Sequence, residues 1–301
     1  MKFPKKIKVI EVGPRDGLQS LNKWIPTQDK IEMINLLSSA NFQVIEVSSF
    51  AHPKVVPMLS DAEKVLEQIN RHPKIVYRAL SPNLKGTFRA VETGMVDEIL
   101  GLLTVSETYS LKNQNMTLDD AISEASKSLR LCEKSDVNFV MAIGVAFYCP
   151  YDGVISNEKI LSVVKRLYNK GIRRVYLAAS TGMESPSKIN YIFNKIRDNF
   201  LDLECGFHVH DRIGMAATNM FSAIDAGATS VEGSICGIGG GIAMPYGTGD
   251  YGNLPTEDIV SMLNRSNIET QLDTKTVHQT AEKIASLLKI SSNSRTNIQK
   301  K

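Results

Sequence analysis

The chain has 301 residues, of which 43% are hydrophobic and 22% are charged, and its formal net charge is +3. These values are typical of a soluble globular protein, and the charge is too small to indicate a nucleic-acid partner. No stretch is apolar for long enough to span a membrane, and no secretory signal follows the basic N-terminus, so we expect a cytoplasmic protein with no membrane partner.

In chain order, β-rich runs alternate with segments that have apolar residues at helical spacing. The patterns predict strands over residues 7–12, 44–47, 74–79, 98–103, 137–145, 173–177, 203–209 and 230–235. Helices are predicted after a cap at 27–29 and over 61–70, 88–93, 118–132, 157–169, 186–200, 215–226 and 256–264, with an additional helix over 274–288.

Strands that alternate with helices indicate parallel βαβ units, and eight such units in about 265 residues are typical of a (β/α)8 TIM barrel. A doubly wound sheet is the rival fold, but no Gly-x-Gly-x-x-Gly follows the first strand. We therefore predict an α/β chain with one barrel domain over 1–290, an additional C-terminal helix and a loose polar tail over 291–301. The four cysteines show no paired metal spacing, which favours reduced thiols.

Polar side chains occur at the carboxyl ends of three predicted strands, where the active site of a TIM barrel lies. Arg15 and Asp16 follow the first strand, Glu46 is in the second, and His208 and His210 are in the seventh. The two histidines are two residues apart on a strand, so they point to one face. Each residue has a simpler interpretation as a buried, satisfied side chain, but their joint position favours a site.

Asp16, His208 and His210 would form a ligand set of nitrogen and oxygen atoms, for which the amide oxygen of Asn253 is a fourth candidate. Such a set, completed by water or substrate oxygens, suits Mg²⁺ or Mn²⁺. The long glycine-rich segment 236–253 follows the last predicted strand and precedes this asparagine. The sequence therefore indicates a divalent cation at the barrel mouth.

Motifs along most of the chain resemble the 3-hydroxy-3-methylglutaryl-CoA lyase family. The similarity covers roughly residues 5–290 in unbroken order, and its most specific element is Gly-Pro-Arg-Asp-Gly-Leu-Gln at 13–19. Further matching segments are Val44-Ile45-Glu46-Val47-Ser48-Ser49-Phe50, Pro82-Asn83-Leu84-Lys85-Gly86, Ser106-Glu107-Thr108, Cys149-Pro150-Tyr151, His208-Val209-His210-Asp211 and Gly252-Asn253-Leu254-Pro255-Thr256.

The resemblance implies a metal-dependent TIM barrel that cleaves a 3-hydroxy-3-methylglutaryl thioester to acetyl-CoA and acetoacetate. It also implies that a divalent cation, Mg²⁺ or Mn²⁺, is bound by Asp16, His208, His210 and Asn253. By the same resemblance, the partner is a small-molecule acyl-CoA, and the chain forms a homodimer.

Four catalytic residues are implied: Arg15 at the thioester oxygen, Glu46 as a support of the site, and Asp16 and His208 at the metal. Physical chemistry agrees with this allocation. Cleavage of the C2–C3 bond requires removal of the alcohol proton, which a bound cation favours, and stabilisation of the thioester enolate, for which the fixed charge of arginine is suited. Substrate contacts are expected at Gln19, Lys112 and Asn113.

Two departures from the family concern reactive groups. The family has a cysteine after Gly-Leu-Gly-Gly on the loop after strand 8, where this chain has Gly241; Cys236 lies before that turn and is expected to be a small buried residue. At strand 6, Leu-Gly-Asp-Thr is replaced by Leu177-Ala178-Ala179-Ser180, which removes an acidic group expected beside the metal. These changes leave two alternatives open: an aldolase or Claisen-type enzyme acting on a different hydroxy or oxo acid, and a catalytically silent binding protein.

Overall fold

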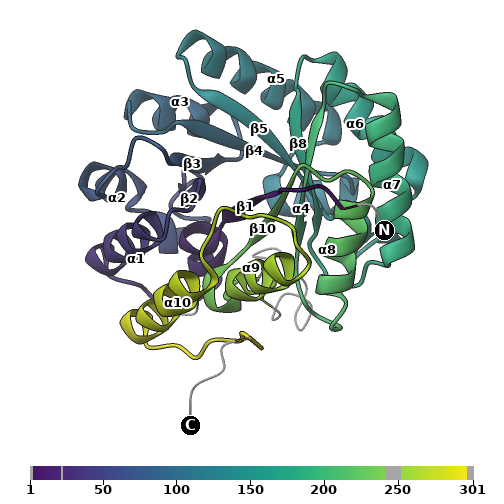
Figure 1. Cartoon of the computed structure of the whole chain (residues 1–301). Coiled ribbons are helices and arrows are strands. Elements are labelled where there is room, and N and C mark those ends of the chain that lie inside the picture. The colour runs from purple at the N-terminus through teal and green to yellow at the C-terminus, as the bar shows by residue number, and fades with distance from the viewer. Residues whose placement is uncertain (1–2, 22, 241–251, 297–301) are drawn as a thin grey trace.

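The computed structural model describes residues 3–21, 23–240 and 252–296. Within these ranges eight parallel strands close into a barrel in the order β1-β10-β9-β8-β5-β4-β3-β2, and Figure 1 shows the helices arranged around it. The strands are β1 (Lys8–Glu11), β2 (Val44–Ser49), β3 (Val76–Ser81), β4 (Glu98–Thr104), β5 (Asn138–Gly144), β8 (Arg174–Ala179), β9 (Glu204–Val209) and β10 (Ser230–Gly233). The predicted (β/α)8 barrel is confirmed.

The helices that follow the barrel strands are close to their predicted positions, with differences at their starts. Helix α1 has Pro26 at its N-cap, and the Thr27 hydroxyl donates to Asp61 at 2.7 Å, so the predicted cap at 27–29 was wrong. Helix α3 begins four residues early because the Asn83 side chain caps it by accepting from the Gly86 amide at 3.0 Å. These helices are α1 (Thr27–Ser39), α2 (Ala62–Gln68), α3 (Leu84–Glu92), α5 (Leu118–Lys134), α6 (Asn157–Asn169), α7 (Pro186–Asn199), α8 (Ala216–Asp225) and α9 (Thr256–Arg265).

Two short elements between barrel units were not predicted from the sequence. Helix α4 (Glu107–Gln114) follows β4, and its N-cap Ser106 accepts a hydrogen bond from the Tyr109 amide at 2.9 Å. The hairpin β6 (Tyr148–Cys149) and β7 (Gly153–Val154) follows β5. Helix α4 has a mostly polar sequence without an apolar stripe, which explains why periodicity did not indicate it.

The strands present alternate residues to the surrounding helices and to the barrel lumen. On β8, Leu177 and Ala179 belong to the large apolar core that includes the helices, whereas Tyr176 and Ala178 belong to a separate lumen cluster. That cluster is apolar and contains Leu80, Leu100, Val140, Ala142, Tyr176 and Ala178. Four charged residues, Glu46, Arg78, Glu98 and Glu232, also lie in the lumen and are each at most 1% exposed. A second, smaller apolar cluster consists of Ile10, Val12 and Val44. The lumen therefore has a wholly apolar side and a side that holds its charged residues.

The additional helix α10 (Thr274–Leu288) packs against α1 and α9, as predicted for the C-terminal helix. The expectation of a loose tail was wrong for residues 291–296. The Asn293 amide donates to the Cys236 carbonyl at 3.0 Å, and Ser294 Oγ donates to Asp258 Oδ1 at 2.6 Å. These bonds attach the segment to the start of α9 and to the segment after β10.

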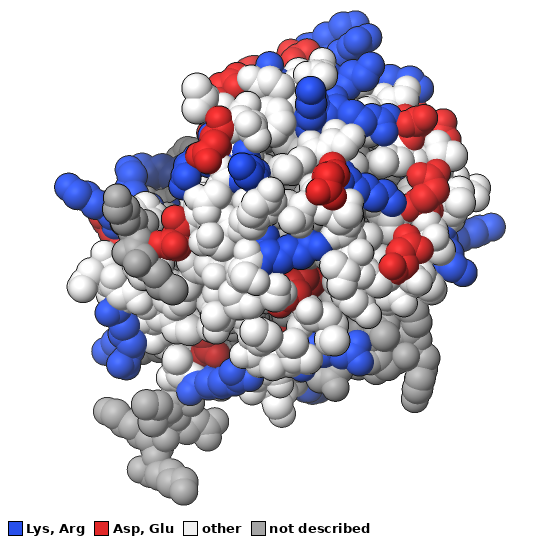
Figure 2. Space-filling model, turned by 90° about the vertical axis from the view of Figure 1, so that its right-hand side faces the viewer, with Lys and Arg blue, Asp and Glu red and all other residues white. Residues whose placement is uncertain are grey.

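The outer surface carries both signs of charge. Figure 2 shows acidic and basic side chains intermixed on the viewed face, in keeping with the small net charge. No helix among the described residues is long and apolar enough to cross a membrane. All four cysteines lie in the described ranges, and each is buried and free.

Candidate metal centre and pocket

Arg15 and Asp16 are held by a tight turn directly after β1. Residues Gly13–Gly17 form a π-helical turn that places the two side chains at the barrel mouth, 5% and 6% exposed. A Cβ on Gly13 would lie 2.6 Å from Glu11 Oε1, so only glycine permits this close approach of turn and strand. The sequence thus predicted the position of the turn, and the glycine explains its geometry.

Glu11 connects this turn to the segment after β10. Its Oε1 accepts from the Gly13 amide at 2.7 Å and from the Ile235 amide at 2.9 Å. Oε2 is buried, and the Thr256 side chain interacts with this carboxyl group. Burial raises the pKa of Glu11 to about 8, since it outweighs the hydrogen bonds that favour the carboxylate. A neutral carboxyl therefore supports the backbone beneath the site at physiological pH.

His208 and His210 lie at the carboxyl end of β9 and approach Asp16. Their Nε2 atoms are 3.1 Å apart, and His210 Nε2 is 3.7 Å from Asp16 Oδ2. One ligand atom from each of the three residues lies within 4.8 Å of the other two, and all three residues are buried. The structure brings together these three predicted ligands from two strand ends.

Charge at this cluster is set by close neighbours. Burial raises the pKa of Asp16, but the opposing charges of Arg15, His208 and His210 outweigh burial and lower it to about 2. The pKa of His208 is lowered by burial, yet its hydrogen bond with Glu232 and the charge of Asp16 leave it raised above the ordinary value. Asp16 is therefore a carboxylate throughout the physiological range.

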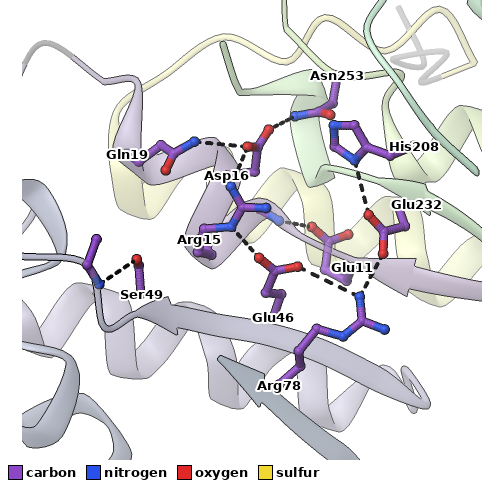
Figure 3. Close-up of polar contacts among 12 residues, drawn as sticks. Glu11, Arg15, Asp16, Gln19, Glu46, Ser49, Arg78, His208, Glu232 and Asn253 are labelled. Carbon is purple, nitrogen blue, oxygen red and sulfur yellow. Dashed lines mark hydrogen bonds and ion pairs between the residues drawn. The ribbon is translucent and has the colours of Figure 1, made fainter. Parts of the chain in front are cut away.

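Glu232 of β10 orients one of the two imidazoles. Its Oε2 lies 3.2 Å from His208 Nδ1, so the opposite ring nitrogen, Nε2, is presented to Asp16 and His210 (Figure 3). A carboxylate on the outer nitrogen of a histidine is a common arrangement around metal ligands because it fixes the ring and its tautomer. Sequence reasoning did not identify Glu232, although a carboxylate inside an apolar strand was a usable signal.

Asn253 completes the cluster from a distant part of the chain. Its Nδ2 donates to Asp16 Oδ2 at 2.7 Å and to the Ile238 carbonyl at 3.1 Å, as Figure 3 shows for Asp16. Its Oδ1 is buried and has no hydrogen-bond partner among the described residues. A Cβ on Gly239 would lie 2.1 Å from Asn253 Nδ2, so a side chain there would displace the amide. An unpaired buried oxygen beside a carboxylate and two imidazoles fits a divalent cation.

Arg15 and Glu46 form the adjoining part of the site. Arg15 Nε donates to Glu46 Oε1, and Arg15 Nη1 donates to Asp16 Oδ1 at 2.6 Å. Although burial lowers the pKa of Arg15, the carboxylates of Glu46 and Asp16 outweigh burial and raise it further above neutrality. The guanidinium is thus a permanent cation, fixed in direction beside the candidate metal ligands.

A pocket opens from this polar cluster toward the apolar side of the lumen. Gln19 lines it and donates through Nε2 to Asp16 Oδ1 at 2.9 Å, and Asn113 of α4 also lines it. Lys112 does not line the pocket; its Nζ lies 5.0 Å from the ring centroid of Tyr151. The apolar part of the wall comprises Val55, Val56, Leu80, Leu102, Met116, Ala142, Val145 and Ala178.

The sequence missed several polar residues of the pocket wall. Helix α4 contributes Tyr109 and Gln114, and their only signal was their place near the Ser106-Glu107-Thr108 motif. Other polar residues in the wall are Ser49, His52, Asn83, Thr104 and Ser180. Ser49 and Thr104 end strands, and the others follow strands, as the barrel rule requires. Ser49 and Asn83 lie in segments that match the family, but nothing in the type or spacing of these five residues marked them as pocket residues.

The two sequence departures have different outcomes. Gly241 lies outside the described residues. Cys236 is buried, and its Sγ donates to the Ala281 carbonyl of α10 at 3.4 Å, so the prediction of a small buried residue is confirmed. Ala179 packs in the outer core. Strand β8 lines the pocket through Tyr176 and, at its carboxyl end, through Ala178, which is followed by Ser180. At this strand end the described pocket wall therefore has a methyl group and a hydroxyl group.

Comparison with known proteins extends these observations. The family model described as HMGL-like matches residues 6–284. A hydroxymethylglutaryl-CoA lyase of Bacillus subtilis is 35% identical over 272 residues, which is 90% of both chains, and a mitochondrial one of Mus musculus is 35% identical over 268 residues, which is 89% of this chain and 81% of that relative.

Among solved structures, an HMG-CoA lyase from Acinetobacter baumannii in complex with coenzyme A and 3-methylmalate superimposes with a TM-score of 0.90 at 33% sequence identity. The match covers 98% of this chain and 95% of that one. The family model spans the whole barrel, and the relatives are similar over most of their length, so the resemblance first seen in the motifs is confirmed. This chain belongs to the HMGL-like family, together with the hydroxymethylglutaryl-CoA lyases.

Proposed function

We propose that this protein is a metal-dependent carbon–carbon lyase that cleaves 3-hydroxy-3-methylglutaryl-CoA, or a similar 3-hydroxyacyl thioester, to acetyl-CoA and a 3-oxo acid. The observation that carries the proposal is the convergence of Asp16, His208 and His210 with Arg15 at one end of a pocket in an HMGL-like barrel. The complex of the Acinetobacter lyase with coenzyme A supports an acyl-CoA ligand.

Asp16, His208, His210 and the Oδ1 atom of Asn253 are the residues that would hold the cation, Mg²⁺ or Mn²⁺. When bound, the cation supplies a Lewis acid that lowers the pKa of the tertiary alcohol of the substrate. His208 has Nδ1 on Glu232 and Nε2 toward the cluster, so we assign it to ligation rather than to proton relay. Gln19 holds the second oxygen of Asp16 and so fixes the direction of its carboxylate.

Arg15 stabilises the enolate in this proposal. Loss of the alcohol proton drives the electron pair of the C2–C3 bond onto the thioester, whose oxygen becomes negative. A guanidinium in a buried site stabilises that charge without reorganisation, because its position is fixed before the reaction. Glu46 and Asp16 fix this position through their bonds to Nε and Nη1.

The apolar part of the pocket provides room for the alkyl group of the substrate, and Asn113 is a candidate contact for its acyl-CoA portion. Lys112 lies over the Tyr151 ring and outside the pocket wall, and its contact with the substrate stays a prediction. The homodimer stays a prediction. The cytoplasmic location also stays a prediction, since one of the matched relatives is a mitochondrial enzyme.

The test is an assay of the purified protein with 3-hydroxy-3-methylglutaryl-CoA and Mg²⁺ or Mn²⁺, with acetyl-CoA and acetoacetate measured as products. We expect metal-dependent turnover, and we expect Arg15→Gln to lower kcat by about 10²–10³ because it removes a fixed charge donor from the enolate. Metal bound without product formation would contradict the substrate assignment. A panel of other 3-hydroxyacyl thioesters and oxo acids would then identify the divergent aldolase or Claisen-type alternative.

A further inference from the structure

Arg78 of β3 is a charged residue in the barrel lumen that does not line the pocket. It is 1% exposed and its guanidinium contacts three carboxylates. Nη1 donates to Glu232 Oε1 at 2.6 Å and lies 3.8 Å from Glu46 Oε2, while Nε donates to Glu98 Oε1 at 2.8 Å. TIM-barrel lumens are mostly filled by branched apolar side chains, and buried charges carry a large desolvation penalty. This arrangement therefore calls for a role beyond packing.

Two of the three carboxylates also contact a residue of the candidate site through their other oxygen. Glu232 uses Oε2 to hold His208 Nδ1 at 3.2 Å, and Glu46 uses Oε1 to accept from Arg15 Nε. The two glutamates belong to β10 and β2, which β1 separates in the barrel. Figure 3 shows the resulting chain of contacts from His208 through Glu232, Arg78 and Glu46 to Arg15. One guanidinium thus joins the metal-ligand side to the enolate side.

We propose that Arg78 is a positioning residue that fixes the guanidinium of Arg15 relative to the metal ligand His208 by bridging Glu46 and Glu232. The inference rests on the proposed function for the roles of Arg15 and the cation. Arg78 acts at a distance because it does not touch the pocket, so its loss affects metal affinity and kcat more than substrate binding. The competing explanation is that Arg78 only neutralises buried carboxylates.

Arg174 offers a matched control for this explanation. Its Nη1 donates to Glu98 Oε2, the oxygen opposite the one that Arg78 holds, and its Nε lies 3.4 Å from Glu204 Oε2. The double variants R78M/E98Q and R174M/E98Q each remove one arginine and the same carboxylate. Both keep the net charge of the group unchanged, which favours folding, and they differ only in which guanidinium is lost.

We would measure Mn²⁺ affinity by calorimetry without substrate, then kcat and KM for the acyl-CoA, at a temperature below the Tm of both variants. R78M/E98Q is expected to weaken Mn²⁺ binding and lower kcat by about tenfold or more, with KM within about threefold of the wild type. R174M/E98Q is expected to stay within about twofold of the wild type in Mn²⁺ affinity, kcat and KM. Equal behaviour of the two variants would overturn the proposal.

The variant R78K tests whether Arg78 acts by bridging two carboxylates or only through its positive charge. The ammonium keeps the positive charge but lacks the planar fork that reaches separate carboxylates. We expect R78K to retain the loss of Mn²⁺ affinity; full recovery to the wild-type value would show that charge alone suffices and would overturn the bridging role. The Mn²⁺ binding measurements use no substrate. Absence of turnover by the wild type would therefore contradict the proposed function, while the Mn²⁺ affinities would still test the role of Arg78.

Discussion

The two sides of the barrel lumen differ in chemistry, although β3 and β4 contribute residues to both. On one side, Leu100, Val140, Ala142 and Ala178 form an apolar cluster that continues into the pocket wall. On the other, carboxylates alternate with arginines between Arg15 and His208 (Figure 3). Apolar side chains leave a pocket wall that can accept an alkyl group. The charged side holds side chains in fixed directions, because Glu232 bonds to Arg78 through one oxygen and to His208 through the other, and Glu46 lies between Arg15 and Arg78.

This difference indicates that the buried charges hold side chains in position more than they stabilise the fold. A buried ion pair has a desolvation penalty that its attraction often only offsets, so apolar packing would stabilise the lumen as well or better. The charged side occurs where side chains must be held in one direction at the barrel mouth. Changes on the charged side should therefore affect metal binding and kcat, and changes on the apolar side should affect KM.

The largest effect is expected from Asp16→Asn, which keeps the shape of the side chain and removes its charge from the candidate metal centre. We expect Mn²⁺ affinity to fall by roughly 100-fold or more, since even residues that only orient a metal ligand change affinity by 10–100-fold. Calorimetry measures the affinity, and lyase activity should fall with it. Asp202→Asn, which changes a carboxylate hydrogen-bonded to Tyr168 on the surface, is the control. Unchanged Mn²⁺ affinity in Asp16→Asn would contradict the role of the charged side in metal binding.

An intermediate effect on stability is expected from Glu11→Gln, through pH. Because the pKa of Glu11 is raised to about 8 by burial, the folded chain holds a proton that the unfolded chain loses above its ordinary pKa near 4.5. The free energy of unfolding of the wild type should thus fall as pH rises from 5 to 8, by about 3 kcal/mol from this group.

Glu11→Gln removes that dependence, so the variant should gain stability relative to the wild type as pH rises. Urea unfolding at pH 5 and pH 8 measures the difference, and Glu67→Gln on the exposed face of α2 is the control. A constant difference between Glu11→Gln and the wild type at both pH values would show that the carboxyl is ionised in the folded chain.

The smallest effect is expected from Ala178→Val on the apolar side. The added methyl groups narrow the pocket beside the alkyl group of the substrate, and we expect KM for the acyl-CoA to rise by about tenfold. Mn²⁺ affinity should change much less than KM, because the side chain of Ala178 belongs to the apolar cluster although its backbone pairs with that of His208. A fall in metal affinity with unchanged KM would reverse the assignment of the two sides.

Much of the site could be predicted from the sequence because it consists of rare residue types at strand ends. Arg15, Asp16, His208 and His210 are conspicuous after β-rich runs, and the period-2 rule alone places the two histidines on one face. Asn253 was only a candidate from the residues, since a single asparagine has no distinctive pattern, and the family motif supported it. The Lys112 contact stays a prediction, and its helix position did not reveal that the side chain lies over Tyr151 and not in the pocket wall.

The sequence by itself determined the barrel, because eight apolar strands that alternate with amphipathic helices can bury their surfaces in few other ways. It also determined the end of the barrel at which chemistry occurs. Only the tertiary structure decided which residues support that chemistry. Glu11, Arg78 and Glu232 lie far apart in sequence, and barrel closure brings Glu232 of β10 within reach of the Arg78 guanidinium on β3. Such contacts depend on strand register and side-chain direction, which local sequence patterns do not specify.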